Sequence, residues 1–482
     1  MEFIIIISSL FIAALIAILS KHRATIEFSS IIAMIIFLIE SFAIAFKVAL
    51  SGEYIESAFF SIDALGAILI LIISCIGLAV AVYSARYLRE ETAKNIIGFT
   101  RIKQYFTLFN LFLVAMFFAV SSNSPILAWI SIEATTLSTA FLISFYNKPS
   151  AMEAAWKYLI INSIGLLLGF FGTLLYFTAL PASGATGLTT WNDLLSNVTH
   201  FDPFIAKIAF IFVLIGYGTK IGLAPMHTWL PDAHSKAPAP ISALLSGVLL
   251  NVAFITMLKF KIITDASIGP DFTQKLLVSF GLLSILISSL IIFTQKQYKR
   301  LLAYSSIENM GITTLGFGFG GLGIFAAILH IIYHSLIKSA LFLLSGNIFL
   351  KYGSTKIAKV RGVISEFPMT GILFLAGFFA IIGAPPFGIF LTKFYIFSAG
   401  ITTYPVITIS VILLTAILFI GFFKHISSMV FGGKQLERKE EKESIWLILP
   451  PLALLSLALY LGFYQPSFLH MLINNVVLRY SL

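Results

Sequence analysis

Cysteine is almost absent from this chain, because Cys75 is the only one in 482 residues. One thiol cannot form an intrachain disulfide, and it cannot supply the several thiolates that hold an iron–sulfur cluster or a structural zinc ion. A Gly-rich phosphate-binding loop following a strand-like run is also missing. We therefore predict that the chain carries no cofactor of its own and that any redox chemistry takes place in another polypeptide.

Charge is scarce as well. Charged residues make up 11% of the sequence and hydrophobic residues 59%, with a mean hydropathy of +0.99, whereas about a quarter of a soluble domain is charged. The longest polar stretch is the mixed-charge run 434–443, which is predicted to be a solvated surface segment. These proportions exclude a water-soluble fold and predict an all-α integral membrane protein.

Long apolar runs are what the sequence has instead. Runs of about 18 or more residues can cross a hydrocarbon core roughly 30 Å thick, and they predict about fourteen transmembrane helices. The predicted spans are residues 3–20, 26–50, 62–85, 104–122, 125–146, 154–180, 204–224, 238–258, 275–295, 298–318, 321–350, 369–399, 404–423 and 445–465. The first is interpreted as a retained helix, because no small-residue cleavage pattern follows Lys21–Arg23.

The basic residues are distributed unevenly between these spans. The odd-numbered connections hold most of the Lys and Arg residues, and the even-numbered ones hold Lys47, Lys207, Lys259, Lys261 and Lys275. Since cytoplasmic loops carry the excess of Lys and Arg, the odd connections are predicted to be cytoplasmic and both termini outside. The net charge of +10 is thus attributed to membrane topology and not to a nucleic-acid partner.

An internal repeat is indicated by two pairs of segments. The sequence around Glu133 resembles that around Glu308, about 175 residues further on. Lys220 and Lys393 each lie near a Pro-containing interruption, and they have almost the same offset. A shift of about five helices inverts the second copy in the membrane, so we predict two inverted five-helix repeats with broken helices in spans seven and twelve. A chance match of short motifs is the alternative.

The predicted division of the chain follows from this repeat. It comprises three N-terminal helices (1–103), the first repeat with a following helix region (104–295, the repeat proper being about 104–258), the remainder of the second repeat (296–433), and a charged loop with the last helix and tail (434–482).

Ionisable residues inside the spans are the candidate functional groups, because a charge at the bilayer centre costs at least about 2.5–3.5 kcal/mol. Glu133 is roughly 12 Å below the surface at 1.5 Å per residue, and Lys220 is its expected partner. His330, His334 and Lys338 share one helix face by their spacing of four residues. Imidazoles can exchange protons near neutral pH and a lysine can store one, so this face is predicted to be a proton relay.

Each candidate has a structural alternative. Glu133 and Lys220 could form a purely structural ion pair. Two histidines four residues apart could bind zinc, but the Glu of the metalloprotease pattern is missing and Lys338 would repel a cation, so no metal site is predicted. Glu308 could mirror Glu133 or form a salt bridge with Lys299 or Arg300, which precede it closely.

Residues of three other kinds were also considered. Pro225 and Pro385 remove backbone donors at membrane depth, which is tolerated where protein or water satisfies the freed carbonyls; ordinary kinks are the alternative. Asn251 can form hydrogen bonds across helices or to water. Near span ends, a snorkelling or interface position is predicted for Lys157, Asp63 and Lys259.

Several of these segments together resemble a known family. The segment that begins Lys220-Ile-Gly-Leu-Ala-Pro-Met-His-Thr-Trp-Leu-Pro-Asp-Ala-His, which contains Asp232 and His234, resembles the signature of the antiporter-like subunits of respiratory complex I, multi-subunit Na⁺/H⁺ antiporters and membrane-bound [NiFe] hydrogenases. Segments 300–306, 330–343 and 383–393 resemble the same family, so the similarity covers about residues 60–400.

The resemblance implies a fourteen-helix fold with inverted repeats and a central polar axis. Glu133, Lys220, His334, Lys338 and Lys393 occupy the positions of that axis. Span eight departs from the family pattern, because this chain has Ser246 and Asn251 where many relatives have His and Lys. Ordered water would therefore have to bridge the axis at span eight.

The complete candidate set is divided by role. The predicted ion-translocation residues are Glu133, Lys220, His330, His334, Lys338 and Lys393, and the supporting residues are His234, Asp232, Asn251, Lys299, Glu308, Pro225 and Pro385.

Segments 242–251 and 304–311 look most like the subunit of formate-hydrogenlyase-type hydrogenases. This resemblance implies a proton- or Na⁺-translocating subunit of a group 4 [NiFe] hydrogenase or formate hydrogenlyase in a prokaryotic plasma membrane. The implied partners are further antiporter-like or small helical membrane subunits and a peripheral hydrogenase or dehydrogenase arm with [NiFe] and Fe–S centres. A subunit of complex I or of a multi-subunit antiporter, a self-standing solute transporter and a structural scaffold are the alternatives, and an enzymatic activity of the chain itself is left open.

Overall fold

The computed structural model describes residues 1–179, 190–433 and 442–480, and it is built from long helices. The N-terminal half contains α1 (Glu2–Leu19), α2 (Arg23–Ser51), α3 (Ala64–Ala93), α4 (Phe99–Ser121), α5 (Pro125–Ile143), α6 (Pro149–Thr178), the short α7 (Trp191–Ser196), α8 (Pro203–Ile221), α9 (Trp229–Lys236) and α10 (Ala239–Leu244). After a π-helical turn at Leu245–Leu249 follow α11 (Leu250–Ile268), α12 (Asp271–Ile291), α13 (Tyr298–Phe319) and α14 (Leu322–Tyr352). The C-terminal part contains the short α15 (Val363–Glu366), α16 (Pro368–Ile382), α17 (Gly388–Thr403), α18 (Pro405–Val430), α19 (Ile445–Phe463) and α20 (Ser467–Tyr480).

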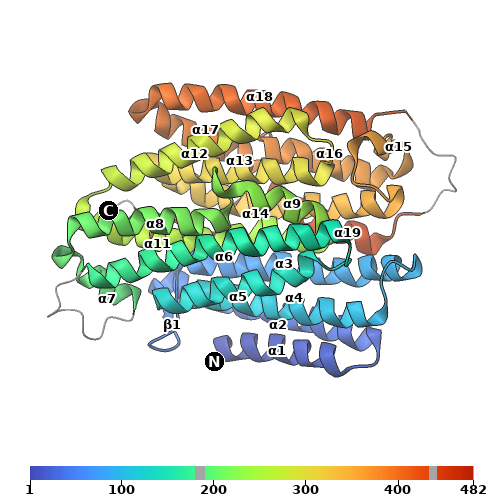
Figure 1. Cartoon of the computed structure of the whole chain (residues 1–482), viewed down its shortest axis with the longest axis horizontal. Coiled ribbons are helices and arrows are strands. Elements are labelled where there is room, and N and C mark those ends of the chain that lie inside the picture. Colours follow the sequence, from blue (N-terminus) through green and yellow to red (C-terminus); the bar gives the residue numbers. More distant parts are fainter. Residues whose placement is uncertain (180–189, 434–441, 481–482) are drawn as a thin grey trace.

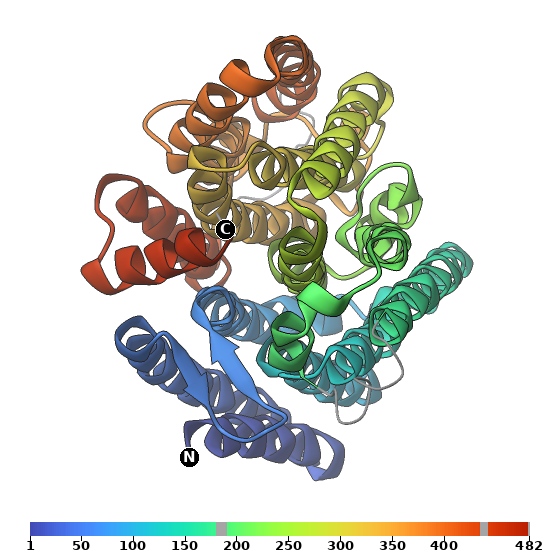
Figure 2. The same ribbon diagram turned by 90° about the vertical axis from the view of Figure 1, so that its left-hand side faces the viewer.

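The long helices run side by side along a common direction (Figure 1). Seen along that direction they form a broad bundle, and both chain ends lie on the face toward the viewer (Figure 2). The same face carries α7 and an antiparallel hairpin of β1 (Glu53–Ile55) and β2 (Ser61–Asp63), which the sequence reasoning missed. The N- and C-terminal ends therefore share one side of the bundle, as expected for an even number of spans.

Twelve helical segments among the described residues are long and apolar enough to cross a membrane. The remaining predicted spans correspond to α13 and to the pair α16 and α17. Buried side chains occupy every position of α13 except Arg300, so α13 faces protein and does not need an apolar surface. The exact number of fourteen spans stays a prediction, whereas the all-helical membrane fold is confirmed.

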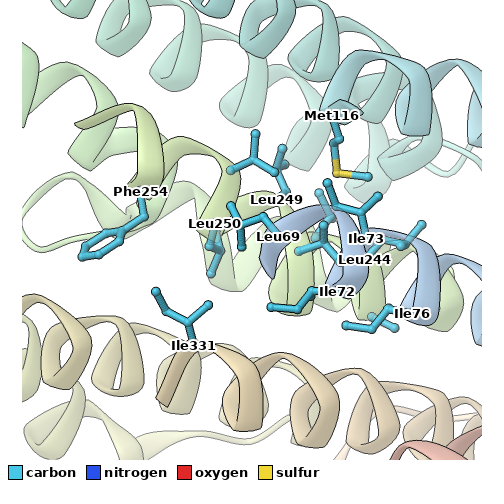
Figure 3. Packing of buried hydrophobic residues seen from close by; sticks show 14 of the residues in the cluster. Leu69, Ile72, Ile73, Ile76, Met116, Leu244, Leu249, Leu250, Phe254 and Ile331 are labelled. Atoms are coloured by element: carbon cyan, nitrogen blue, oxygen red, sulfur yellow. The ribbon is translucent and has the colours of Figure 1, made fainter. Parts of the chain in front are cut away.

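The centre of the bundle is formed by α11, α13 and α14, whose residues are almost all buried. Apolar side chains from α3, α11 and α14 interlock there (Figure 3). The labelled residues of this cluster are Leu69, Ile72, Ile73, Ile76, Met116, Leu244, Leu249, Leu250, Phe254 and Ile331. Large apolar side chains are exposed on the outer helices, for example Phe141 on α5 and Leu413 on α18, and hydrocarbon can cover them.

Glycine residues allow α6 and α8 to contact each other closely. A Cβ atom added to Gly216 on α8 would overlap the backbone of Gly169 on α6, so these two backbones touch directly. Close approach through small residues is the usual way in which helices associate in lipid, where no hydrophobic driving force holds them together. The contact fixes α8, and with it Lys220, against α6.

Two helices are broken at the predicted positions. The first ends at Ile221 with Gly222 at φ 80°, and helical structure resumes at Met226. The second ends at Ile382 with Gly383 at φ 86°, and α17 begins at Gly388. Positive φ angles favour glycine, and the prolines that follow lack the backbone donor that would continue the helix. The repeat relation between the two halves stays a prediction.

Three further predictions concern the ends of spans. Residues 434–441 of the predicted charged surface run lie outside the described residues. Asp63 and Lys259 lie at one end of the bundle, near span ends; their side chains are only 7% and 12% accessible, and the two charged atoms are 3.9 Å apart. The physical reason is that α20 covers this end of the bundle, where Arg479 reaches Asp63 at 3.4 Å. Lys157 remains half-exposed and contacts Glu153 at 2.6 Å.

Candidate ion-translocation site

Lys220 lies in the last turn of α8, directly before the break, and is completely buried. Its ammonium donates hydrogen bonds to Thr136 Oγ1 at 2.8 Å and to the Tyr158 hydroxyl at 2.7 Å. The ammonium also lies 4.9 Å from the centre of the Tyr158 ring, within the range of a cation–π contact. The carbonyl end of a helix carries partial negative charge, so the broken helix itself favours a cation at this position.

Glu133 on α5 does not contact Lys220, and the prediction of a direct pair is wrong. One of its carboxylate oxygens accepts a hydrogen bond from Ser163 Oγ at 2.7 Å. The other is buried and has no hydrogen-bond partner in the described part of the chain. The reason is that Glu133 turns toward Ser163 of α6, whereas Lys220 is held by the hydroxyl groups of Thr136, about one turn further along α5, and of Tyr158 on α6. The two charges still interact electrostatically.

Lys338 is the central cation of the site. It is fully buried on α14, and its ammonium donates to the Leu302 carbonyl and to Ser305 Oγ of α13, both at 2.7 Å. These acceptors are neutral, so the positive charge of Lys338 is solvated by dipoles alone. Glu308 and Lys393 lie within electrostatic range.

The two histidines continue this face of α14. The rings of His330 and His334 are nearly parallel, with centroids 6.5 Å apart. His330 Nδ1 lies 2.8 Å from Thr392 Oγ1 and His330 Nε2 lies 3.0 Å from Asn309 Oδ1. His334 is buried, and its Nε2 has no hydrogen-bond partner among the residues that the structure describes. A ring nitrogen of this kind is available to accept or donate a proton if water or a neighbouring group reaches it.

Lys393 on α17 closes the row with an ion pair. Its ammonium is 2.8 Å from Glu308 Oε1, and it also lies 3.4 Å from the Ile382 carbonyl, which the broken end of α16 leaves free. The side chains of Glu308 and Lys393 are 1% and 10% accessible. The prediction of a Glu308 salt bridge with Lys299 or Arg300 is therefore wrong, because Glu308 lies more than two turns deeper in α13 and faces α17.

The basic residues that precede Glu308 have other partners. Lys299 donates to the Ala237 carbonyl at 2.7 Å, and Arg300 contacts Asp232. Asp232 is also 3.6 Å from Lys157. His234 is completely buried, has no hydrogen-bond partner on either ring nitrogen within the described chain, and stacks on Phe342 with ring centroids 4.7 Å apart.

Span eight connects the two halves of the site through neutral groups. Asn251 Nδ2 donates to Ser335 Oγ on α14 at 2.9 Å, and Ser246 shares a 2.7 Å hydrogen bond with Ser306 on α13. The π-helical turn Leu245–Leu249 contains Ser246 and ends two residues before Asn251; such turns are frequent at functional sites. An amide and a hydroxyl can form hydrogen bonds but do not hold a charge, so span eight contributes no titratable group between the two halves of the site.

The Pro225 and Pro385 positions lie in the two interruptions, within a few residues of Lys220 and Lys393 respectively. Within residues 1–179, 190–433 and 442–480, no group of three or more His, Cys, Asp or Glu side chains is placed to hold a metal ion. The arrangement brings together buried cations, imidazoles and hydroxyls, which are groups that can exchange protons.

Several members of the site were missed from the sequence. They are the hydrogen-bonding partners Thr136, Tyr158, Ser163, Ser305, Asn309 and Thr392. A usable signal existed: Ser305 and Asn309 are four residues apart in span ten, which places two polar groups on one helix face. Among the neutral polar residues, the sequence analysis singled out only Asn251 and Ser246.

Comparison with known proteins places this geometry in a family. The family described as NADH:quinone oxidoreductase/Mrp antiporter, transmembrane, matches residues 122–419. The chain is 38% identical over 388 residues to a hydrogenase-4 component F homolog of Methylacidiphilum infernorum, covering 80% of each chain. It is 28% identical over 378 residues to NADH-quinone oxidoreductase subunit N of Desulforudis audaxviator, covering 77% of this chain and 72% of the relative.

A solved structure gives the same fold. The chain superposes on a subunit of the membrane-bound sulfane sulfur reductase, an archaeal respiratory membrane complex, with a TM-score of 0.87 and 22% identity, covering 100% of this chain and 97% of that one. The family match spans more than half of the sequence and includes both broken helices. The chain belongs to the family of NADH:quinone oxidoreductase/Mrp antiporter transmembrane subunits.

Proposed function

We propose that the chain translocates protons as the antiporter-like subunit of an energy-converting hydrogenase complex of the formate-hydrogenlyase type. The observation that carries the proposal is the pair of broken helices, each of which has a buried ammonium, Lys220 or Lys393, within a few residues of its interruption. Neither charge would be retained at membrane depth without a use for it, because each costs several kcal/mol to bury.

The proposed path follows the buried polar groups. Its titratable members are Glu133, Lys220, Lys338, His334, His330 and Lys393. Between Lys220 and Lys338 the path runs past Asn251 and Ser335, where water supplies the carrier that span eight lacks. Between Lys338 and Lys393 the imidazoles of His334 and His330 accept and release the proton in turn.

Separation of the Lys393–Glu308 ion pair is the step that a neighbouring subunit can drive. Separating the two groups leaves two buried charges without compensation, which costs several kcal/mol. Transfer of a proton from the ammonium to a neighbour or to water removes that cost. A movement of α17 relative to α13 would therefore eject a proton, and its reversal would take one up. A neighbouring subunit that moves α17 could couple this step to electron transfer.

The partners are proposed from the relatives. A relative at 38% identity carries the name hydrogenase-4 component F homolog, which supports an assembly with other membrane subunits and with a peripheral arm bearing the [NiFe] and Fe–S centres. The excess of basic residues in the odd connections supports a cytoplasmic location for that arm, with both termini outside a prokaryotic plasma membrane. The ion is proposed to be H⁺, because lysine and histidine exchange protons and do not bind Na⁺.

Two measurements on one preparation test the proposal. Purification in mild detergent should yield this chain together with a [NiFe] subunit. In membrane vesicles, the variants E133A and K220A should lose proton translocation while electron transfer in the assembled complex continues. Translocation unchanged in both variants would indicate a structural scaffold, and solute uptake by the chain reconstituted alone would indicate a self-standing transporter.

A further inference from the structure

A further buried carboxylate lies at the end of the bundle opposite the termini. Glu91 is in the last turn of α3, a helix that starts beside the β hairpin and runs to the other face (Figure 1). Its side chain is fully buried. One carboxylate oxygen accepts a 2.5 Å hydrogen bond from the Tyr146 hydroxyl, and the other is buried without a partner in the described residues.

A structural role alone does not account for this arrangement. A buried carboxylate oxygen that lacks a hydrogen bond costs at least about 1–3 kcal/mol, and a buried structural carboxylate normally has both oxygens satisfied. The neighbouring Glu90 behaves in the ordinary way: it is partly exposed and pairs with Arg86 at 2.6 Å. Glu91 is therefore suited to take up a proton.

A polar cavity of about 170 Å³ lies beside Tyr146, the hydrogen-bond donor to Glu91. Its lining includes Tyr87, Tyr146, Ser150 and Lys299, and it is large and polar enough to hold several water molecules. The hydroxyls of Tyr87 and Tyr146 are 3.3 Å apart. Tyr146 thus touches the cavity on one side and Glu91 on the other, so its hydroxyl stands between the water and the carboxylate.

On the inner side the cavity leads toward the axis. Lys299 lines it, and Lys299 and Glu91 interact electrostatically. The Lys299 ammonium is held by the carbonyl of Ala237, three residues after His234. The His234 ring, whose nitrogens are unpartnered in the described structure, stacks on Phe342 of α14, one turn after Lys338. The order from the surface inward is therefore Glu91, Lys299, His234, Lys338.

We propose that Glu91 is the proton-loading group of an uptake path that leads from this face to Lys338, a proposal that rests on the proposed function. A protonated water of the cavity gives a proton to the Tyr146 hydroxyl as that hydroxyl passes its own proton to the Glu91 oxygen that it contacts. The resulting carboxylic acid returns the proton through the same hydroxyl to a cavity water, which gives it to the neutral amine of Lys299. His234 takes it from the Lys299 ammonium and hands it to Lys338. Each donor loses one proton and each acceptor gains one.

The charged and titratable groups around Glu91 come from four parts of the chain. Tyr83 and Tyr87 lie on its own helix, Tyr105 on α4, Tyr146 and Lys148 on the α5–α6 connection, and Lys299 on α13. Glu91 is the acidic member of this group. Removing its carboxylate should therefore remove an acid titration from the pH dependence of proton uptake, while removing a tyrosine hydroxyl should not.

The test compares E91Q with E90Q in vesicles that contain the assembled complex. Proton translocation is followed with a pH-sensitive dye and electron transfer is measured on the same vesicles. E91Q should lower translocation by about tenfold or more, in the range expected for losing a proton-transfer group, and should flatten the pH profile. E90Q should leave both unchanged, and E91D should restore much of the loss.

Translocation by E91Q at the rate of the unaltered complex would overturn the inference. If E91Q reduces the amount of assembled complex, Y146F decides, because it keeps the carboxylate and removes the hydroxyl: unchanged translocation in Y146F overturns the path, and a loss supports it. The proposed function fails separately, when the unaltered complex itself moves no protons or when K220A translocates at the full rate.

Discussion

Replacing Lys393 by methionine removes the ammonium that neutralises Glu308 and leaves a chain of similar shape. The two side chains are 10% and 1% accessible, so solvent screening of their 2.8 Å contact is small. Removing one partner of a buried pair costs about 3–5 kcal/mol, because the remaining charge is left uncompensated. K393M should therefore lower the thermal midpoint of the purified chain by several degrees.

The double variant E308Q/K393M isolates the cause. With both charges removed neither member of the pair is left uncompensated, so the loss of stability should be smaller than in K393M alone. Cys75 provides the assay, because it is half-buried in α3 and is the sole cysteine of the sequence. A thiol-reactive dye that fluoresces on coupling reports its exposure as the helices separate.

The outcome can refute the reasoning directly. If the double variant is as unstable as the sum of the two single variants, the ion pair does not carry the energy and side-chain packing does. Proton translocation gives the second readout: E308Q/K393M should remain inactive although its stability has recovered, since the path would lack its last cation.

Three further predictions concern other parts of the chain. N251L, measured by dye-detected translocation in vesicles, should reduce proton flow by about tenfold with electron transfer retained, since it removes the polar link in span eight. G216A should destabilise the purified chain by about 1–3 kcal/mol, because its new methyl group overlaps the facing helix, and the thermal midpoint will show it. The Tyr54 hydroxyl holds the pKa of Glu56 below its ordinary value. The contact of Glu56 with the Met1 amine therefore stabilises the hairpin at neutral pH and is lost as the pH falls below about 4. Hydrogen exchange at the hairpin should rise below that pH, and Y54F should move the loss to higher pH.

The spans and the breaks could be predicted because their causes are local. An apolar run of sufficient length must be a spanning helix, and Gly222 or Gly383 followed by proline must interrupt one. The hairpin at 53–63 escaped because its strands are three residues long, too short for an alternation pattern to be recognised.

The partners of the charges could not be predicted, because they depend on how each helix is rotated about its axis. The sequence places Glu133 and Lys220 at similar depths, but Glu133 turns toward Ser163. Glu308 follows Lys299 closely in sequence and pairs with Lys393, 85 residues later. Such pairings are set by tertiary packing, and a single sequence holds no record of the rotation.

The position of both chain ends on one face has a practical consequence. A fluorescent protein fused to either end would report from the same side of the membrane (Figure 2). The opposite side, where the helices carry Glu91, Lys148 and Lys236, would stay free of any tag. An assembled complex could therefore be labelled, immobilised and imaged through either terminus without obstructing the surface on which a peripheral arm would dock.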